Sequence, residues 1–341
     1  MPASPIAIKR TGLVTSVGLS TPAACAAIRA KVSNPTETRF IDAGGERIMA
    51  HQVALEAPWS GRSKLCKMAA MVIADCLRDI PREEWGRVPL LLAVAERERP
   101  GRLDGLDDRL FLEIQDELRA RFASESCIVA HGRVSVVIAL ALARKLIADG
   151  NNSLVLIAAT DSLLAWPTLS AYEREDRLLT PRNSNGFMPG EGAGALLVGQ
   201  PTGDGELHCN GIGFAIENAS IDSDEPLRAD GLSAAIKCAL ADAGCELHDL
   251  DYRITDISGE QYYFKEAALA LSRVLRQRKE EFELWHPAES IGETGATAGV
   301  AALAVAGDAA RKFYAPGTGI LAHFSNDAGR RAAAVLNFRG T

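Results

Sequence analysis

One stretch decides the fold that we expect for this chain: Gly186-Phe187-Met188-Pro189-Gly190-Glu191-Gly192-Ala193-Gly194-Ala195-Leu196-Leu197-Val198. Glycines surround the carboxylate of Glu191, and the apolar run Ala195–Val198 follows. Glycines at this spacing allow a tight turn and a close approach of other segments. The apolar run is typical of a buried strand. We therefore predict a glycine-rich turn leading into a central strand, with Glu191 accepting backbone N–H bonds in the turn.

Composition excludes several classes of protein. Hydrophobic residues make up 47% of the 341 residues and charged residues 24%, which excludes a disordered chain. The net charge of −7 argues against a nucleic-acid partner. The seven cysteines are scattered without a C-x-x-C pair, as expected for reduced, buried thiols. With no signal-like N-terminus and no uncharged run of about 18 apolar residues, we expect a soluble, cytoplasmic protein with no membrane partner.

Strands and helices alternate along the chain in two successive cycles. Expected strands are Ile6–Ile8 with Leu13–Val17 (bent at Gly12), Val88–Val94, Ser153–Ala159, Ala195–Val198, Glu206–Phe214, Tyr252–Ile257, Gly319–Phe324 and Ala332–Phe338. Expected helices are Thr21–Lys31, Ser63–Leu77, Arg109–Phe122, Val134–Ala148, Leu232–Ala243, Tyr262–Arg276 and Ala296–Ala310. Each cycle contains one nearly all-apolar helix, Val134–Ala148 or Ala296–Ala310, which predicts a duplicated αβα unit whose apolar helices pack together.

We place the boundary between the two units in the linker Pro201-Thr202-Gly203-Asp204-Gly205. This position divides the chain into an N-terminal half, residues 1–199, and a C-terminal half, residues 206–341.

Three further motifs accompany the glycine-rich stretch. They are Thr11-Gly12-Leu13-Val14-Thr15-Ser16-Val17-Gly18, Ala241-Asp242-Ala243-Gly244 followed by Asp249-Leu250-Asp251-Tyr252, and Gly292-Glu293-Thr294-Gly295-Ala296-Thr297-Ala298-Gly299. In this order the set resembles β-ketoacyl-[acyl-carrier-protein] synthases of the thiolase-fold superfamily. The resemblance implies a five-layered α-β-α-β-α arrangement of two pseudo-duplicated halves. It also implies a homodimer, or a heterodimer with a related subunit.

The resemblance also shows where the chain departs from the family. The position of the family's nucleophilic cysteine falls on Arg133, and those of its two histidines fall on Ser258 and Glu293. The position of its lysine falls near Ala288. A guanidinium has no free lone pair and stays protonated, so it cannot attack a thioester. The sequence therefore predicts a degenerate member that lacks the Cys-His-His set.

A buried arginine needs a carboxylate partner, so we expect an ion pair between Arg133 and Glu293 in place of the Cys–His pair; the alternative is that both face solvent. Arg330 and Arg331 replace glycines of the family's last loop, Asn326–Arg331, which should narrow the acyl pocket. The pocket candidates are His131, Ser135, Cys127, Glu191 and Asn326. No spacing of His131, His286 and His323 suggests a metal site, and we expect no cofactor.

These features predict a non-catalytic scaffold, adaptor or partner subunit of fatty acid or polyketide biosynthesis. Chain-length-factor subunits of polyketide synthases are a family precedent, and thiolase-like proteins of bacterial secretion clusters are another. The expected partners are accordingly acyl carrier protein or a secretion-system component. One alternative is a 3-oxoacyl-[acyl-carrier-protein] synthase-type acyltransferase that uses Ser135 or Cys127 with His131. Another is a ligand-binding module with an intact pocket and no chemistry.

Overall fold

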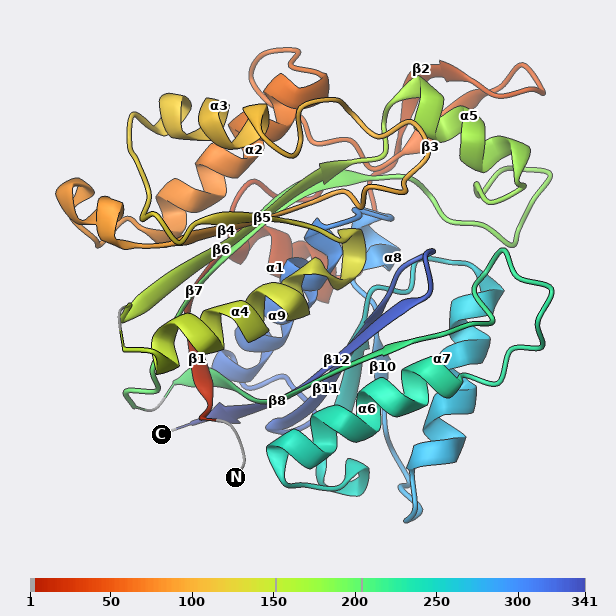
Figure 1. Ribbon diagram of the computed structural model, residues 1–341. Coiled ribbons are helices and arrows are strands. Elements are labelled where there is room, and N and C mark those ends of the chain that lie inside the picture. Colours follow the sequence, from red (N-terminus) through yellow and green to blue (C-terminus); the bar gives the residue numbers. More distant parts are fainter. Residues whose placement is uncertain (1–3, 151, 204, 341) are drawn as a thin grey trace.

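The computed structural model describes residues 4–150, 152–203 and 205–340 (Figure 1). The N-terminal half contributes β1 (Ile6–Val14), β4 (Leu90–Val94), β5 (Cys127–Ala130), β6 (Leu154–Ser162) and β7 (Glu191–Gly199). The C-terminal half contributes β8 (Glu206–Ile216), β9 (Tyr252–Thr255), β10 (Leu284–Trp285), β11 (Gly319–Ser325) and β12 (Arg330–Arg339).

The two halves have the same strand topology. The order is β5-β4-β6-β7-β1 in one and β10-β9-β11-β12-β8 in the other, which is the same order of successive strands. The directions also correspond: β4 is parallel to β5 and β6, as β9 is to β10 and β11, and the remaining pairs are antiparallel. β1 also pairs with β8, so the two sheets join into one sheet of ten strands.

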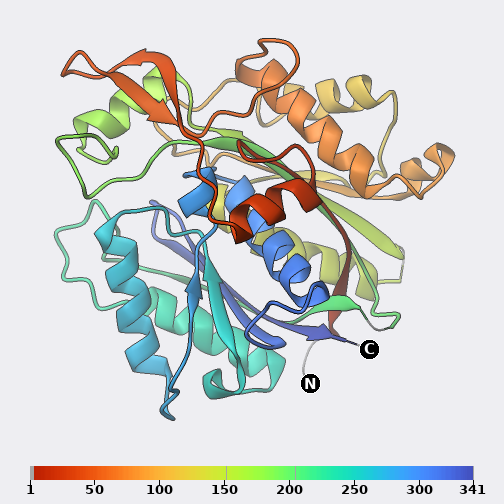
Figure 2. The same ribbon diagram turned by 180° about the vertical axis from the view of Figure 1, so that it is seen from behind.

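Helices form three layers around this sheet (Figures 1 and 2). Helices α2 (Gly61–Cys76) and α3 (Arg109–Leu118) cover the outer face of the first half, and α6 (Asp230–Ala243) and α7 (Gln261–Val274) cover that of the second. Between the halves lie α1 (Thr21–Arg29), α4 (Ser135–Ala148) and α9 (Thr297–Arg311). The predicted five-layered α-β-α-β-α fold is confirmed. Whether residues 1–199 and 206–341 are separate domains stays a prediction, and Asp204 of the proposed linker lies outside the described residues.

The central layer is apolar, as predicted from the two Ala-rich helices. Every residue of α9 from Thr297 to Ala310 is buried, and α4 buries Val136, Val137 and Leu140 in the same core. The remaining elements are the hairpin of β2 (Thr36–Ile41) and β3 (Arg47–Ala50), α5 (Trp166–Arg174), and α8 (Ala288–Ile291). In the part of the chain that the structure describes, no helix combines the length and apolarity needed to cross a membrane.

Local predictions differ from the structure at a few places. The helix predicted to reach Phe122 ends at Leu118, because Arg119 adopts the left-handed conformation with φ 49°. The first strand is continuous through Gly12, and its irregularity lies between Ile8 and Arg10. The sequence missed β5 and β10, which at four and two residues are too short to show a periodicity.

Close approach of helix to strand explains several glycines. A Cβ at Gly12 of β1 would lie 2.6 Å from the carbonyl oxygen of Val72 on α2. At Gly213 of β8, a Cβ would lie 2.1 Å from the carbonyl oxygen of Ala235 on α6. In both halves, the first outer helix therefore packs closely against the first strand at a glycine. This close contact requires a residue without a side chain.

This packing predicts that Gly213→Ala destabilises the fold. The added methyl meets backbone atoms of α6, which cannot rotate away, so we expect a loss of roughly 1–3 kcal/mol in the free energy of unfolding. Urea denaturation measures it. Gly203→Ala is the matched control, since a Cβ there meets no atom within 4 Å. Equal stabilities of the two variants would contradict the close approach.

Candidate functional site

Arg133 occupies the turn that leads into the first central helix. Strand β5 ends at Ala130, the short 3-10 helix Gly132–Val134 follows, and α4 begins at Ser135. Gly132 has φ 56°, and any Cβ there would lie 1.9 Å from a carboxylate oxygen of Glu96. This turn directs the Arg133 side chain into the protein, where the residue is only 7% exposed. The alternative that this side chain faces solvent is wrong.

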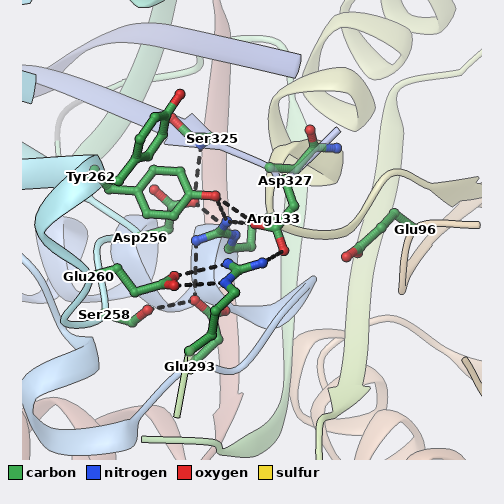
Figure 3. A network of polar contacts seen from close by, with 12 residues as sticks. Glu96, Arg133, Asp256, Ser258, Glu260, Tyr262, Glu293, Ser325 and Asp327 are labelled. Carbon is green, nitrogen blue, oxygen red and sulfur yellow. Dashed lines mark hydrogen bonds and ion pairs between the residues drawn. The ribbon is translucent and has the colours of Figure 1, made fainter. Parts of the chain in front are cut away.

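Four hydrogen-bonding or ionic contacts and one aromatic ring surround the Arg133 guanidinium (Figure 3). Nη1 lies 3.3 Å from Oε2 of Glu293, and Nη2 donates to Oδ1 of Asp327 and to the hydroxyl of Tyr263, both at 2.7 Å. Nε lies 3.7 Å from Oδ2 of Asp256. The Tyr263 hydroxyl donates to Asp327 at 2.5 Å, and its ring centre lies 4.5 Å from the guanidinium carbon. The predicted Arg133–Glu293 ion pair is present and belongs to a larger cluster.

The three positions inferred from the family resemblance meet at Glu293. Ser258 donates its hydroxyl proton to Glu293 Oε2 at 2.8 Å, beside the Arg133 contact. The backbone N–H of Gly295 donates to Glu293 Oε1 at 2.9 Å. Next to it, the N–H of Ala296 donates to Asp161 Oδ2 at 2.8 Å. The N–H groups at the start of α9, which would suit an anionic ligand, are therefore used by carboxylates of the protein itself.

A second arginine extends the cluster. Arg177 forms a two-pronged ion pair with Glu260, at 2.8 and 3.0 Å, and donates through Nη1 to Asp327 at 2.9 Å. Asp327 thus bridges Arg133 and Arg177. Both arginines come from the first half of the chain, whereas Asp327 and Glu260 come from the second.

A third arginine forms the side of the cluster nearest α9. Arg99 pairs with Glu96 through two hydrogen bonds of 2.7 and 3.1 Å, and with Asp161 at 2.7 Å. Gly295 has φ 54° and passes so close that a Cβ would lie 2.0 Å from Asp161. Only glycine fits at this crossing.

Carboxylates outnumber arginines around Arg133 and Arg177, and their pKa values diverge. Burial raises the pKa of Glu293 to about 7, even though Arg133 acts to lower it. Burial also raises the pKa of Asp256. Burial acts on Asp327 in the same direction, yet Arg133 and Arg177 together hold its pKa below the ordinary value. Glu293 and Asp256 therefore hold a proton more tightly than exposed carboxyl groups do, whereas Asp327 holds one less tightly.

Almost no free space remains among these side chains. The cavity that they enclose has a volume of about 10 Å³ and is lined by Glu96, Arg99, Arg133, Leu163, Tyr172, Arg177, Phe187, Glu260, Glu293 and Asp327. This is about the room that one water molecule needs.

The alternative nucleophiles are engaged elsewhere or distant from the cluster. Ser135 accepts from the backbone N–H of His131 at 3.1 Å and donates to the carbonyl of Val129 at 3.0 Å, so its hydroxyl ties the turn together. Cys127 begins β5, three residues before the end of that strand, which separates the two ends by about 10 Å. Among the described residues, no hydrogen bond joins the side chains of Cys127, His131 and Ser135 to one another.

Glu191 and Asn326 hold segments together. Glu191 accepts from the backbone N–H of Val53 at 2.9 Å and from Ser162 at 3.0 Å, and it pairs with Lys64. Glu191 is the first residue of β7, so it lies in a strand and binds neighbouring segments; the prediction that it accepts N–H bonds within a tight turn is wrong. Asn326 closes the last loop by accepting from the N–H of Arg330 at 2.9 Å, and it donates to the carbonyl of His131 at 3.4 Å.

The last loop reaches the cluster through a residue that the sequence analysis overlooked. The two arginines belong to β12, where Arg331 is fully buried against Glu266 at 2.7 Å; Asp327 is the loop residue that enters the cluster. Sequence reasoning also missed Tyr263, Arg177 and Glu260. One signal was available, since Asp256 directly follows β9 and Asp327 lies two residues after the end of β11. No group of three His, Cys, Asp or Glu suited to a metal occurs in residues 4–150, 152–203 and 205–340.

Comparison with solved structures finds ketosynthases along the whole chain. The ishigamide ketosynthase/chain length factor has 18% identity and a TM-score of 0.78, over 99% of this chain and 100% of that chain. A second match is a type II PKS acyl-carrier protein in complex with its ketosynthase bound to the hexaketide (AntDE:AntF). It has 15% identity and a TM-score of 0.82, over 99% of this chain and 100% of that chain. A third match is the ketosynthase ApeO in complex with its chain length factor ApeC, from Xenorhabdus doucetiae. It has 12% identity and a TM-score of 0.79, over 98% of this chain and 98% of that chain.

No protein-family model matches the sequence, and no curated protein is detectably similar to it. At these identities the structural likeness shows the fold alone, which is the thiolase-like ketosynthase fold.

The raised pKa of Glu293 predicts how stability depends on pH. A carboxyl group whose pKa is higher in the folded state than in the unfolded one stabilises the fold fully below its unfolded pKa, near 4.5, and this contribution is lost as the pH rises through about 7. Between pH 5 and pH 8 we expect the free energy of unfolding of the wild type to fall by up to roughly 3 kcal/mol relative to that of Glu293→Gln. Urea unfolding at each pH measures the difference.

The control for this measurement is Glu280→Gln, which alters an exposed carboxylate. Its stability curve should run parallel to that of wild type. A Glu293→Gln curve that is also parallel to wild type would show that Glu293 is ionised at the same pH in the folded and unfolded chain.

Proposed function

We propose that this chain is a ketosynthase-like protein without condensing activity, which acts as a partner subunit or scaffold. One observation carries the proposal: a guanidinium neutralised by surrounding carboxylates stands at the head of α4. A guanidinium held in this way provides no lone pair for attack on a thioester.

Two further requirements of acyl transfer are also unmet at this place. The N–H groups of Gly295 and Ala296 donate to Glu293 and Asp161, so they are not free to stabilise an oxyanion. The cavity of about 10 Å³ is far below the few hundred Å³ that a small substrate occupies. The same volume argues against a ligand-binding module that uses this site.

A role as partner subunit is supported by the free edge of the sheet. Strand β5 ends the ten-stranded sheet and pairs only with β4 among the described residues. An edge strand presents unpaired N–H and C=O groups that can join a second chain. Two of the similar structures pair a ketosynthase with a chain length factor, and another holds an acyl carrier protein. We infer a homodimer or heterodimer through this edge, with an acyl carrier protein or a secretion-system component as a further partner.

Incubation with radiolabelled acetyl-coenzyme A tests the loss of acyl transfer. We expect no covalent label on the protein after denaturation, because Arg133 cannot form a thioester and Ser135 is used in the turn. An active ketosynthase treated in parallel is the positive control. Stable label that disappears in Cys127→Ala or Ser135→Ala would instead identify an acyltransferase with altered residues.

Sedimentation equilibrium tests the free edge of β5. We expect the purified chain to have the mass of two copies, and Cys127→Lys to shift it toward one, because a charged lysine at an edge strand opposes pairing. Leu112→Lys is the matched control, on the exposed face of α3 and away from the edge. A wild-type chain with the mass of one copy would exclude the homodimer and leave only pairing with a different subunit.

A further inference from the structure

A second cavity, of about 450 Å³, lies at the other end of the sheet. It is bounded by the end of α1 and by the segment Glu283–Ser290, which contains β10 and most of α8. Val305 of α9 and Tyr314, three residues after α9 ends, complete the lining. Figure 2 shows α1 on this face of the molecule. Strand β10 ends the sheet opposite β5, so this cavity is distinct from the Arg133 cluster and from the edge proposed for pairing.

Aromatic side chains give the cavity a flat apolar wall. The rings of Trp285 and Tyr314 are nearly parallel, with an interplanar angle of 18° and centres 6.4 Å apart. The buried ring of Tyr252 supports Trp285 from its own centre 4.7 Å away, and Val305 is buried beside them. A wall of this shape favours a planar, apolar ligand group.

Three polar side chains of the cavity that have no partner among the described residues can donate hydrogen bonds. Its two carboxylates already have partners: Glu283 accepts from the indole N–H of Trp285 at 2.6 Å, and Glu289 lies 3.4 Å from His286. By contrast, Arg29, Lys31 and Ser290 form no side-chain hydrogen bond and no ion pair within the described residues. Ser290 is only 3% exposed, and its hydroxyl forms no hydrogen bond with the described residues, so it is available to a ligand.

The geometry of Arg29 suits the binding of an anion. Its guanidinium carbon lies 4.2 Å from the centre of the Tyr314 ring. Stacking on a ring holds the guanidinium in place and leaves its N–H edge free for two parallel hydrogen bonds to a carboxylate or phosphate. Lys31, at the end of α1, adds a second positive charge at the rim.

We propose that this cavity binds a planar aromatic acid, with the ring against Trp285 and Tyr314 and the anionic group on Arg29 and Lys31. The volume lies within the range of small-molecule sites. Two kinds of ligand, an aromatic carboxylate and a nucleotide, both carry the flat ring and the anionic group that the cavity would bind. This proposal is independent of the role proposed for the Arg133 cluster, because different residues form the two sites and acyl labelling does not test this cavity.

Isothermal titration calorimetry with four probes tests the proposal. The probes are 1-naphthoate and AMP, and their neutral counterparts 1-naphthalenemethanol and adenosine. We expect at least one anion to bind, and at least about tenfold more tightly than its neutral counterpart, because a bidentate ionic contact is worth that much. Binding of naphthoate alone indicates a carboxylate ligand, and binding of AMP alone indicates a phosphate.

Variants locate the binding in this cavity. Arg29→Ala should weaken the binding of the anion at least about tenfold. Ser290→Ala should weaken it about threefold, because a neutral hydrogen bond contributes less to affinity than an ionic one. Arg87→Ala removes an exposed arginine elsewhere and should leave affinity unchanged. The proposal is overturned if neither anion binds at about 1 mM, if the neutral probes bind equally well, or if Arg29→Ala binds like wild type while keeping the same melting temperature.

Discussion

A permanently charged guanidinium inside a protein must be surrounded by opposite charge, and this constraint shapes the centre of the molecule. Removing a charge from water costs many kcal/mol unless nearby groups compensate. Arg133 receives compensation from Asp256, Glu293 and Asp327, and Tyr263 accepts a further hydrogen bond from it. The fold provides these partners because the ends of β9 and β11 and the start of α9 all face the head of α4.

The cluster also connects the two halves of the chain. Arg133 and Arg177 come from the first half, and Glu260, Glu293 and Asp327 from the second. Such buried networks add little net stability compared with a well-packed apolar core, but losing one member leaves others unpaired and is costly. The docking of the two halves places each of these charges beside a partner from the other half. The cluster leaves a cavity of only about 10 Å³, and the N–H groups of Gly295 and Ala296 beside it donate to carboxylates of the protein.

The fold and part of the site could be predicted from the sequence because their signals are local. Burial of the helix Ala296–Ala310 and of the glycine-rich stretch ending at Val198 could be predicted, because apolar residues and glycines recur in them at regular spacing. The ion pair of Arg133 with Glu293 could be expected because the family resemblance aligns both positions with groups that face each other. Asp327, Tyr263 and Arg177 gave no such signal. They lie 194, 130 and 44 positions from Arg133. Only the folded chain brings Asp327 and Tyr263 within 3 Å of Arg133, and Arg177 within 3 Å of Asp327.

By itself, the sequence determined the layered architecture, the two apolar central helices, and an arginine at the position that the family resemblance assigns to the thiolate. These properties depend on residue type and periodicity, which act over a few turns of chain. The tertiary structure alone decided how the arginine is neutralised, how little space remains beside it, and where Arg29, Ser290 and Tyr314 form a separate cavity. Those properties depend on contacts between distant segments, and the free energy of such contacts is set by packing and burial in three dimensions.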